Sequence, residues 1–264
     1  MTRPAFLDLG PNRRLAYALT APAAAGRDLP GVVFLGGFRS DMEGTKALAL
    51  EEWARRAGRG FLRFDYSGHG RSSGAFEDGC IGDWADDARE AVTRLTEGPQ
   101  ILVGSSMGGW IALLLARAAP ERVAALVGVA AAPDFTLEMA AAMDEAAKAE
   151  MASSGVWLRP SAYSDEPYPI TRRLIEDGAR NRVLDRPFPV GFPVRLLQGT
   201  ADEDVGVDVA LGLLSHLDGP DVRLTLVRGA DHRFSGPREL ELLIAAVEEA
   251  GAAWRAQNGI VSPE

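Results

Sequence analysis

Short apolar runs alternate with segments of helical periodicity through the first half of the chain. The runs Gly31–Leu35, Phe61–Phe64 and Val123–Val129 predict buried strands. The segments 41–58 and 81–96, which lie between them, predict amphipathic helices. Strands that alternate with helices form a mainly parallel sheet covered on both faces, so the pattern predicts the α/β class.

Runs nearer the two ends of the chain extend this sheet. We expect an antiparallel hairpin before the first buried strand and two further strands late in the chain, at 5–9, 14–19, 194–198 and 222–227. Helices are expected at 205–217 and 237–254. With the run that begins at Ile101, the sheet has eight strands.

The alternation stops between Pro133 and Pro193, where no apolar run is as strong as those before it. We expect one helix over Thr136–Ala152 and another over Ile170–Leu184, with a loop rich in Pro and Tyr between them. This segment predicts a small helical cap, residues 133–192, inserted into a core formed by residues 1–132 and 193–264.

A Gly-x-Ser-x-Gly motif, Gly104 to Gly108, lies between a buried run and an apolar helical segment. This strand–motif–helix context is that of the nucleophile elbow of α/β-hydrolases, whose tight turn holds the central serine in a strained conformation. Ser106 is therefore the predicted nucleophile, and the amide of Met107 at the helix start is a predicted oxyanion donor. The alternative is a glycine-rich turn without chemistry.

The first buried strand runs into Gly36-Gly37-Phe38. A glycine pair lets the backbone turn its amides toward a ligand, and this loop supplies the second oxyanion donor in such folds. We expect that donor to be the amide of Phe38. The alternative is a plain turn from strand to helix.

Three histidines compete for the role of general base. The chain order in this fold is serine, acid, histidine, so His69 is excluded because it precedes the nucleophile. His216 lies inside a predicted amphipathic helix, where a structural role is expected. His232 follows the last strand and is the base that remains.

The acid is expected on the loop after 194–198, where Asp202, Glu203 and Asp204 are all close in sequence. Asp231 adjoins the base itself, but adjacent side chains on an extended backbone diverge. Asp202 is preferred, and spacing alone leaves its two acidic neighbours open.

Composition narrows the partners. A net charge of −9 and a pI near 5.0 argue against nucleic acid and anionic membranes as partners. The single cysteine, Cys80, excludes an internal disulfide, and nothing around it resembles a Cys-His site. No apolar stretch has membrane-spanning length. The first twenty residues lack the composition of a signal or transit peptide, so a cytoplasmic protein is expected.

From Gly31 to about Leu243 the chain resembles the α/β-hydrolase domain-containing protein ten family, a family of palmitoyl-protein thioesterases and acyl-glucuronide esterases. Runs outside the elbow carry the likeness: Gly44-Thr45-Lys46-Ala47, Phe64-Asp65-Tyr66-Ser67-Gly68, Gly98-Pro99-Gln100, Gly155-Val156-Trp157 and Asp231-His232-Arg233. The resemblance implies Ser106, Asp202 and His232 as the catalytic triad.

The expected activity is that of a serine hydrolase that needs no cofactor or metal and cleaves thioesters or esters of a small molecule or an S-acylated protein. Trp157 and Tyr163 are predicted substrate contacts in an apolar acyl pocket, to which Met139, Met143 and Tyr168 would also contribute. The alternative is that these cap residues only pack the cap onto the body. The alternative functions are a broad small-molecule carboxylesterase and a non-catalytic binding protein of the same fold.

Overall fold

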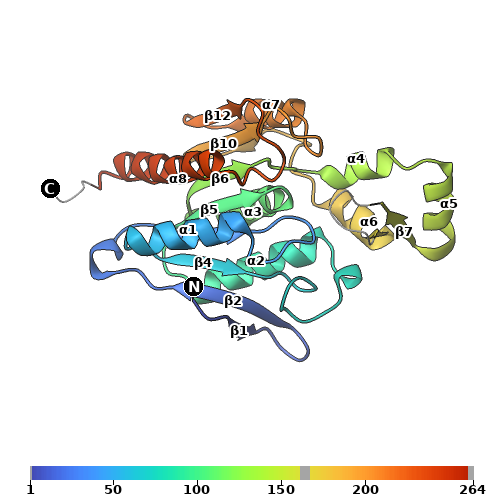
Figure 1. Cartoon of the computed structure of the whole chain (residues 1–264), viewed down its shortest axis with the longest axis horizontal. Helices are drawn as coiled ribbons and strands as arrows, with labels where there is room; N and C mark the ends of the chain where they lie inside the picture. The colour runs from blue at the N-terminus through green and yellow to red at the C-terminus, as the bar shows by residue number, and fades with distance from the viewer. Residues whose placement is uncertain (1, 161–166, 261–264) are drawn as a thin grey trace.

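A single sheet of eight strands forms the centre of the molecule (Figure 1). The computed structural model describes residues 2–160 and 167–260. Within them the strand order is β1-β2-β4-β3-β5-β6-β10-β12. The bounds are β1 Ala5–Asp8, β2 Arg14–Thr20, β3 Gly31–Leu35, β4 Phe61–Phe64, β5 Gln100–Ser105, β6 Val123–Val129, β10 Val194–Gly199 and β12 Val222–Val227.

The sheet is parallel from β4 to β12, and the two strands at its N-terminal edge are antiparallel. The central strands β4, β5, β6 and β10 are buried along their whole length. Their sequences are therefore mainly apolar, because a parallel sheet is covered on both faces. The predicted fold class, an α/β-hydrolase fold with eight strands, is confirmed.

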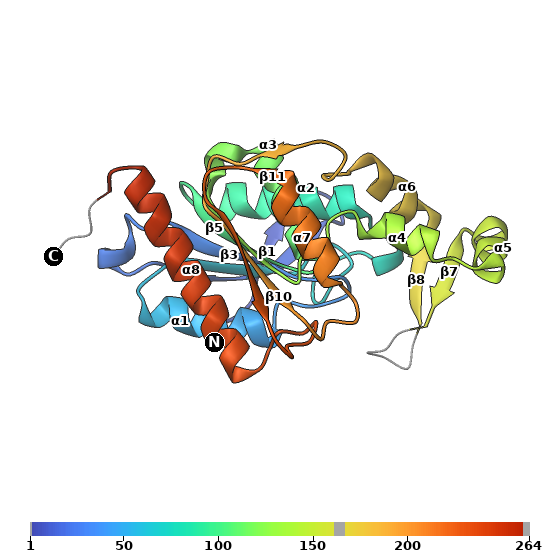
Figure 2. The same ribbon diagram turned by 90° about the horizontal axis from the view of Figure 1, so that it is seen from above.

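Helices pack on both faces of the sheet (Figure 2). One face carries α1, Thr45–Arg56, and α8, Pro237–Gln257, which enclose a core that includes Phe34, Leu50 and Val247. The other face carries α2, Ile81–Leu95, α3, Met107–Ala118, and α7, Val207–His216. Single turns of 3₁₀ helix lie in the connections, at Ala24–Gly26, Phe76–Asp78 and Pro120–Arg122.

The segment between β6 and β10 projects at one end of the molecule (Figures 1 and 2). It contains α4 Phe135–Ala141, α5 Glu145–Ser154, the antiparallel pair β7 Val156–Arg159 and β8 Tyr168–Thr171, and α6 Arg172–Arg180. Its last strand, β9 Phe188–Pro189, pairs with β11 Leu217–Asp218 beside the body. This segment covers the end of the sheet where β5 runs into α3.

Two expectations for the cap are wrong. The single helix predicted over 136–152 is two helices, because the chain turns at Ala142 and the carboxylate of Asp144 accepts the amide of Ala147 at 2.8 Å to start α5. Strands β7 and β8 lie where only a loop is expected, and β8 takes up the first two residues, 170 and 171, of the second expected helix. Thr171 caps that helix, its hydroxyl oxygen accepting the amide of Leu174 at 3.1 Å.

The two ends of the cap are tied to each other and to the body. The buried carboxylate of Asp134 accepts the amides of Val183 at 2.9 Å and Leu184 at 3.0 Å. The indole of Trp110, on α3, donates to the carbonyl of Asn181 at 3.0 Å. The cap is therefore anchored close to the elbow helix.

Glycines let α3 pack against the sheet directly after the elbow. A Cβ added to Gly104 would overlap the carbonyl of Gly108, and one added to Gly108 would overlap the carbonyl oxygen of Leu35 on β3. The steric requirement that the motif predicts for these two positions is therefore present in the packing.

We expect Gly108→Ala to lower the free energy of unfolding by about 1–3 kcal/mol, because the added methyl group forces the backbones of α3 and β3 apart. Gly212→Ala is the control, since Gly212 is exposed on α7 and an added Cβ meets nothing within 4 Å. That change should raise stability by about 0.5–1 kcal/mol. Urea unfolding of both variants checks this, and equal stabilities would contradict the packing argument.

Candidate active site

Ser106 lies in the tight turn between β5 and α3. Its φ of +54° and ψ of −119° are strained for a residue with a side chain. The backbone on either side is well bonded, because the Ser106 amide donates to the carbonyl of Val129 at 2.9 Å and its carbonyl accepts the amides of Gly109 and Ala132. The surrounding hydrogen bonds hold the turn in this conformation.

His232 and Asp202 extend from this serine as one chain of hydrogen bonds. The Nε2 atom of His232 lies 3.2 Å from Ser106 Oγ, and its Nδ1 atom lies 3.0 Å from Asp202 Oδ2. Because the carboxylate accepts from Nδ1, the proton of the neutral ring lies there and Nε2 is left to accept the serine proton. The structure brings together all three residues of the predicted triad.

The carboxylate of Asp202 is held by the loop that carries it. Its side chain is fully buried, and Oδ1 accepts the amides of Asp204 at 3.0 Å and Val205 at 2.9 Å. The amide group of buried Gln198 donates to Oδ2 at 3.0 Å. Burial raises the pKa of Asp202, but the hydrogen bonds from His232, Val205 and Gln198 outweigh it, so this pKa lies below its ordinary value.

Gln198 was not singled out from the sequence. It is the fifth residue of β10, and within a buried strand its amide has no sequence signal apart from being a polar residue in an apolar run.

The loop after β3 lies directly beside the elbow. A Cβ on Gly37 would sit 3.5 Å from the Cβ of Ser106, so the backbone of this loop approaches the serine closely. The ring of Phe38 packs edge-on against Phe76, Phe135 and Tyr168, at centroid distances of 4.9, 5.6 and 6.0 Å. Met107 is the first residue of α3, with a buried side chain. Both predicted oxyanion amides thus belong to backbone next to Ser106.

His69 stabilises this loop through a hydrogen bond to its backbone. Its Nε2 atom accepts the amide of Arg39 at 3.3 Å, and its Nδ1 atom lies 3.2 Å from the carbonyl of Ser67. Arg39 has a φ of +57°, so the contact holds a strained residue next to Phe38. Burial lowers the pKa of His69 to about 4, so the ring is neutral near pH 7. Its one ring proton lies on Nδ1, which donates to the Ser67 carbonyl, and Nε2 is left to accept. The structural role expected for His69 is the one it has.

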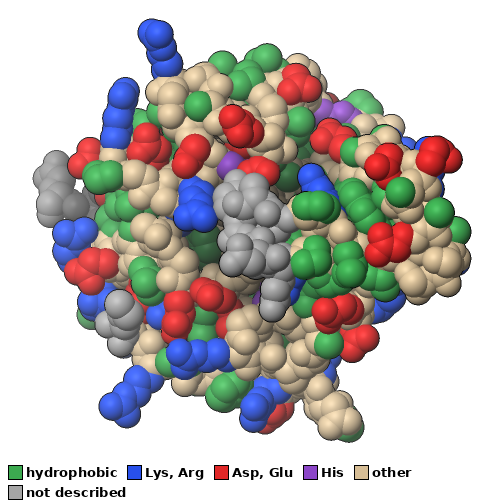
Figure 3. All heavy atoms as spheres, turned by 45° about the vertical axis from the view of Figure 1, so that its right-hand side comes forward, with side chains coloured by type: hydrophobic (Ala, Val, Ile, Leu, Met, Phe, Trp, Pro, Cys, Tyr) green, Lys and Arg blue, Asp and Glu red, His purple; other side chains and the backbone are tan. Residues whose placement is uncertain are grey.

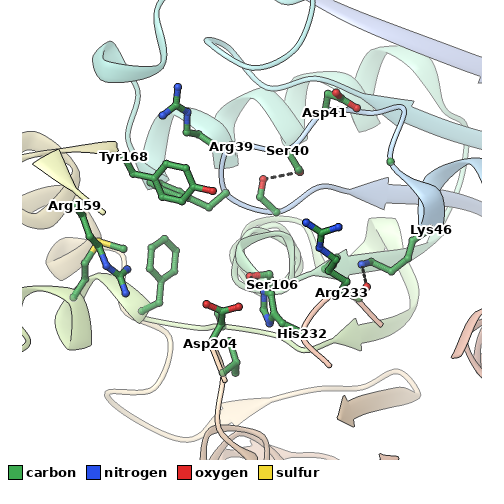
Figure 4. A pocket seen from close by; sticks show the side chains of 18 of the residues that line it. Arg39, Ser40, Asp41, Lys46, Ser106, Arg159, Tyr168, Asp204, His232 and Arg233 are labelled. Carbon is green, nitrogen blue, oxygen red and sulfur yellow. Dashed lines mark hydrogen bonds between the residues drawn. The ribbon is translucent and has the colours of Figure 1, made fainter. Parts of the chain in front are cut away.

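A cavity of about 550 Å³ opens above Ser106 and His232 (Figure 4). Apolar cap residues line one side of it: Phe135, Met139, Ala142 and Tyr168. Trp157 is not among its lining residues and instead packs, partly buried, against the core. Met143 is also buried in that core, and Tyr163 lies outside the described residues.

Charged side chains of both signs also line the cavity. In Figure 4, Lys46 and Arg233 lie on one side of Ser106, while Arg159 and Tyr168 lie on the other. The acidic members are Asp41, Glu138 and Asp204. On the face shown in Figure 3, basic and acidic side chains are likewise interspersed.

In the described part of the chain, one group of side chains is close enough to hold a metal ion. Ligand atoms of Asp202, Asp204 and His232 lie within 4.8 Å of one another. Asp202 and His232 already use Oδ and Nδ1 atoms in their mutual hydrogen bonds. A cation bound there would compete with the contact that orients the histidine.

Comparison with known proteins decides the family. A family model described as the alpha/beta hydrolase fold matches residues 34–174. The chain belongs to the α/β-hydrolase family. The resemblance found from the sequence runs is also confirmed, because this α/β-hydrolase is 39% identical to palmitoyl-protein thioesterase ABHD10, mitochondrial, of Bos taurus over 83% of its length and 72% of the relative's. Identity to the human protein of that name is 38%, and the match covers 83% of this chain and 72% of the human protein.

Two solved structures match this α/β-hydrolase over almost its whole length. One, from Agrobacterium vitis S4, has a TM-score of 0.89 and 42% identity, and the match covers 95% of this chain and 98% of that one. The other, alpha/beta hydrolase domain-containing protein 10 from mouse, has a TM-score of 0.85 and 36% identity, with 94% and 98% covered.

The expectation of a cytoplasmic location is wrong by this comparison, because the relatives named ABHD10 are named as mitochondrial. That expectation depends only on the composition of the first twenty residues. Among the described residues, no helix combines the length and apolar composition needed to cross a bilayer.

The depressed pKa of His69 predicts an effect on stability. Between about pH 4 and the ordinary pKa of 6.5, the unfolded chain binds more protons at His69 than the folded protein does. Stability therefore rises with pH through this window, and acidification from 6.5 to 4 removes up to about 3 kcal/mol through this residue. His69→Gln, which retains an acceptor for the Arg39 amide, should lose correspondingly less. Urea unfolding of both proteins at four pH values between 4 and 6.5 checks this. If the free energy of unfolding changed with pH equally in the two proteins, the prediction would be contradicted.

Proposed function

We propose that this serine hydrolase of ester and thioester bonds works through Ser106 as nucleophile, His232 as general base and Asp202 as the acid that orients the base. The observation that carries the proposal is the continuous chain of hydrogen bonds from Ser106 Oγ through His232 to the buried Asp202 carboxylate. A serine hydroxyl is a weak nucleophile without such a base, and the base needs a carboxylate to select its tautomer.

In the first half-reaction, His232 Nε2 takes the hydroxyl proton as Ser106 Oγ attacks the acyl carbon. The negative charge that develops on the carbonyl oxygen is stabilised by the amides of Phe38 and Met107. The tetrahedral intermediate then expels the thiolate or alkoxide, which receives the proton from His232. Water attacks the acyl-enzyme in the second half-reaction, again with His232 as base, and releases the acid.

We expect Ser106→Ala to lower kcat on the order of 10⁶-fold, the scale seen when a triad serine is removed. The variant should unfold at a temperature similar to that of the unaltered protein and should not be labelled by a fluorophosphonate. Ser105→Ala is the matched control, because Ser105 is the buried last residue of β5. Near-normal turnover by Ser106→Ala would overturn the mechanism. If the fluorophosphonate labels the unaltered protein but that protein turns over no ester, the result would favour a binding protein.

The substrate we propose is a thioester with a long acyl chain, carried by a small molecule or a protein. The support is the set of apolar residues that the cap contributes to the cavity lining, together with the likeness to proteins named palmitoyl-protein thioesterase. Phe135, Met139 and Tyr168 are the residues we expect the acyl chain to contact. Each buried methylene contributes about 0.8 kcal/mol, so chain length should govern the rate.

We therefore expect kcat/KM to rise with acyl length from about four to eight carbons, since binding energy realised in the transition state raises this ratio. The measurement is a matched series of acyl thioesters and oxygen esters. Met139→Ala should flatten the dependence, whereas Trp157→Ala, outside the cavity lining, should leave it unchanged. A flat or falling series for the unaltered protein would favour a carboxylesterase for small esters. If Trp157→Ala, and not Met139→Ala, abolished the dependence of kcat/KM on acyl length, Trp157 rather than Met139 would line the acyl pocket.

A further inference from the structure

This chain contains few lysines, and one of them lies at the candidate active site. Lysine and arginine together number 28, and only Lys46 and Lys148 are lysines. Lys148 is exposed on α5, where it pairs with Glu145 at 2.8 Å. Lys46 is half-buried in the first turn of α1 and lines the cavity above Ser106.

The ammonium group of Lys46 contacts the loop that carries the base. Its Nζ atom donates a hydrogen bond to the carbonyl oxygen of Arg233, the residue directly after His232 (Figure 4). The two residues are 187 positions apart in sequence. The contact therefore joins the helix that follows the Gly37–Phe38 loop to the segment 229–236, which we call the base loop.

The base loop is the turn between β12 and α8. Phe234 has a φ of +47° and a fully buried ring, and its amide donates to Asp231 within the loop. The hydrogen bond from His232 Nδ1 to Asp202 orients the ring. On the far side of His232, the carbonyl of Arg233 also accepts the hydroxyl of Ser235 at 2.7 Å, and this bond, like that of Phe234, lies within the base loop. Lys46 supplies a charged donor to a backbone carbonyl on that side.

We propose that Lys46 is a positioning residue for the base: it clamps the base loop to α1 and so keeps His232 Nε2 within reach of Ser106 Oγ. This inference rests on the proposed function, because it assigns His232 as the base. A displacement of about 1 Å in a reacting group is enough to slow catalysis on the order of a hundredfold.

The charges around Lys46 give the clamp a pH dependence. Burial lowers the pKa of Lys46 to about 8; the carboxylate of Asp231 raises it and the guanidinium of Arg233 lowers it, both from the base loop. Asp41, from the segment before α1, lines the same cavity. Below pH 8 the donor is an ammonium group, and above pH 8 a neutral amine donates a weaker hydrogen bond. Arginine at this position would stay protonated across this range.

The test compares Lys46→Met and Lys46→Arg in the full-length protein, with Lys148→Met as the matched control. The substrates are 4-nitrophenyl butanoate and 3-carboxy-4-nitrophenyl butanoate, which differ only in a carboxylate on the leaving group. We expect Lys46→Met to lower kcat about ten- to a hundredfold on both esters, with KM changed less than twofold. In the unaltered protein we expect kcat to decline above about pH 8, where Lys46 loses its charge. Lys46→Arg should recover most of kcat and should not show this decline. Lys148→Met should match the unaltered protein.

Three results would overturn the proposal. One is an unchanged kcat in Lys46→Met, which would make the contact incidental. Another is a rise in KM confined to the carboxylate ester, which would make Lys46 a binding group for an anionic substrate. The third is an equal loss of kcat in Lys46→Met and Lys46→Arg, accompanied by a lower unfolding temperature in both, which would indicate a packing role. Ser106→Ala, measured in the same experiment, distinguishes failure of this proposal from failure of the proposed function. If Ser106→Ala keeps its turnover, both the role of Lys46 and the proposed function fail.

Discussion

The close packing of α3 against β3 is the constraint on which the site depends. Gly108 lets the elbow helix approach the carbonyl of Leu35 so closely that no side chain fits between them. The strained conformation of Ser106 persists because the sheet and α3 hold the chain on both sides of it. The same approach brings the loop after β3 beside the serine, so one packing contact positions both the nucleophile and the backbone we assign to the oxyanion.

Three loops from distant parts of the chain meet at this point, and each is held by a polar contact from a neighbouring element. His69 accepts the amide of Arg39 behind the first loop, Gln198 donates to Asp202 on the second, and Lys46 donates to the carbonyl of Arg233 on the third. Each contact restrains a residue adjacent to, or within, the proposed catalytic set. The fold therefore provides a scaffold of hydrogen bonds around a site whose chemistry needs only a few atoms.

The cap contributes differently, because it shapes the space above the serine rather than the chemistry. Asp134 and Trp110 anchor its two ends, and α4 presents Phe135 and Met139 to the cavity. Its hairpin brings Tyr168 edge-on against Phe38, so the cluster of aromatic rings around the loop after β3 extends into the cap. Under the proposed function, a change at Met139 would alter substrate choice without altering the contact between Gly108 and Leu35.

The sequence alone determined the class of fold, and it predicted the elbow and the base that we propose. Buried parallel strands are continuous apolar runs, the elbow needs glycines at fixed spacing, and chain order leaves His232 after the other histidines are set aside. Only the tertiary structure decided what depends on the direction of side chains. Asp202 rather than Asp204 faces Nδ1 of His232, Gln198 turns a buried amide toward that carboxylate, and Lys46 reaches a carbonyl 187 residues away. The break at 142–144 and the cavity lining by Met139 instead of Trp157 belong to the same group. Spacing along the chain specifies which residues are near the site, but packing between elements decides which atoms meet.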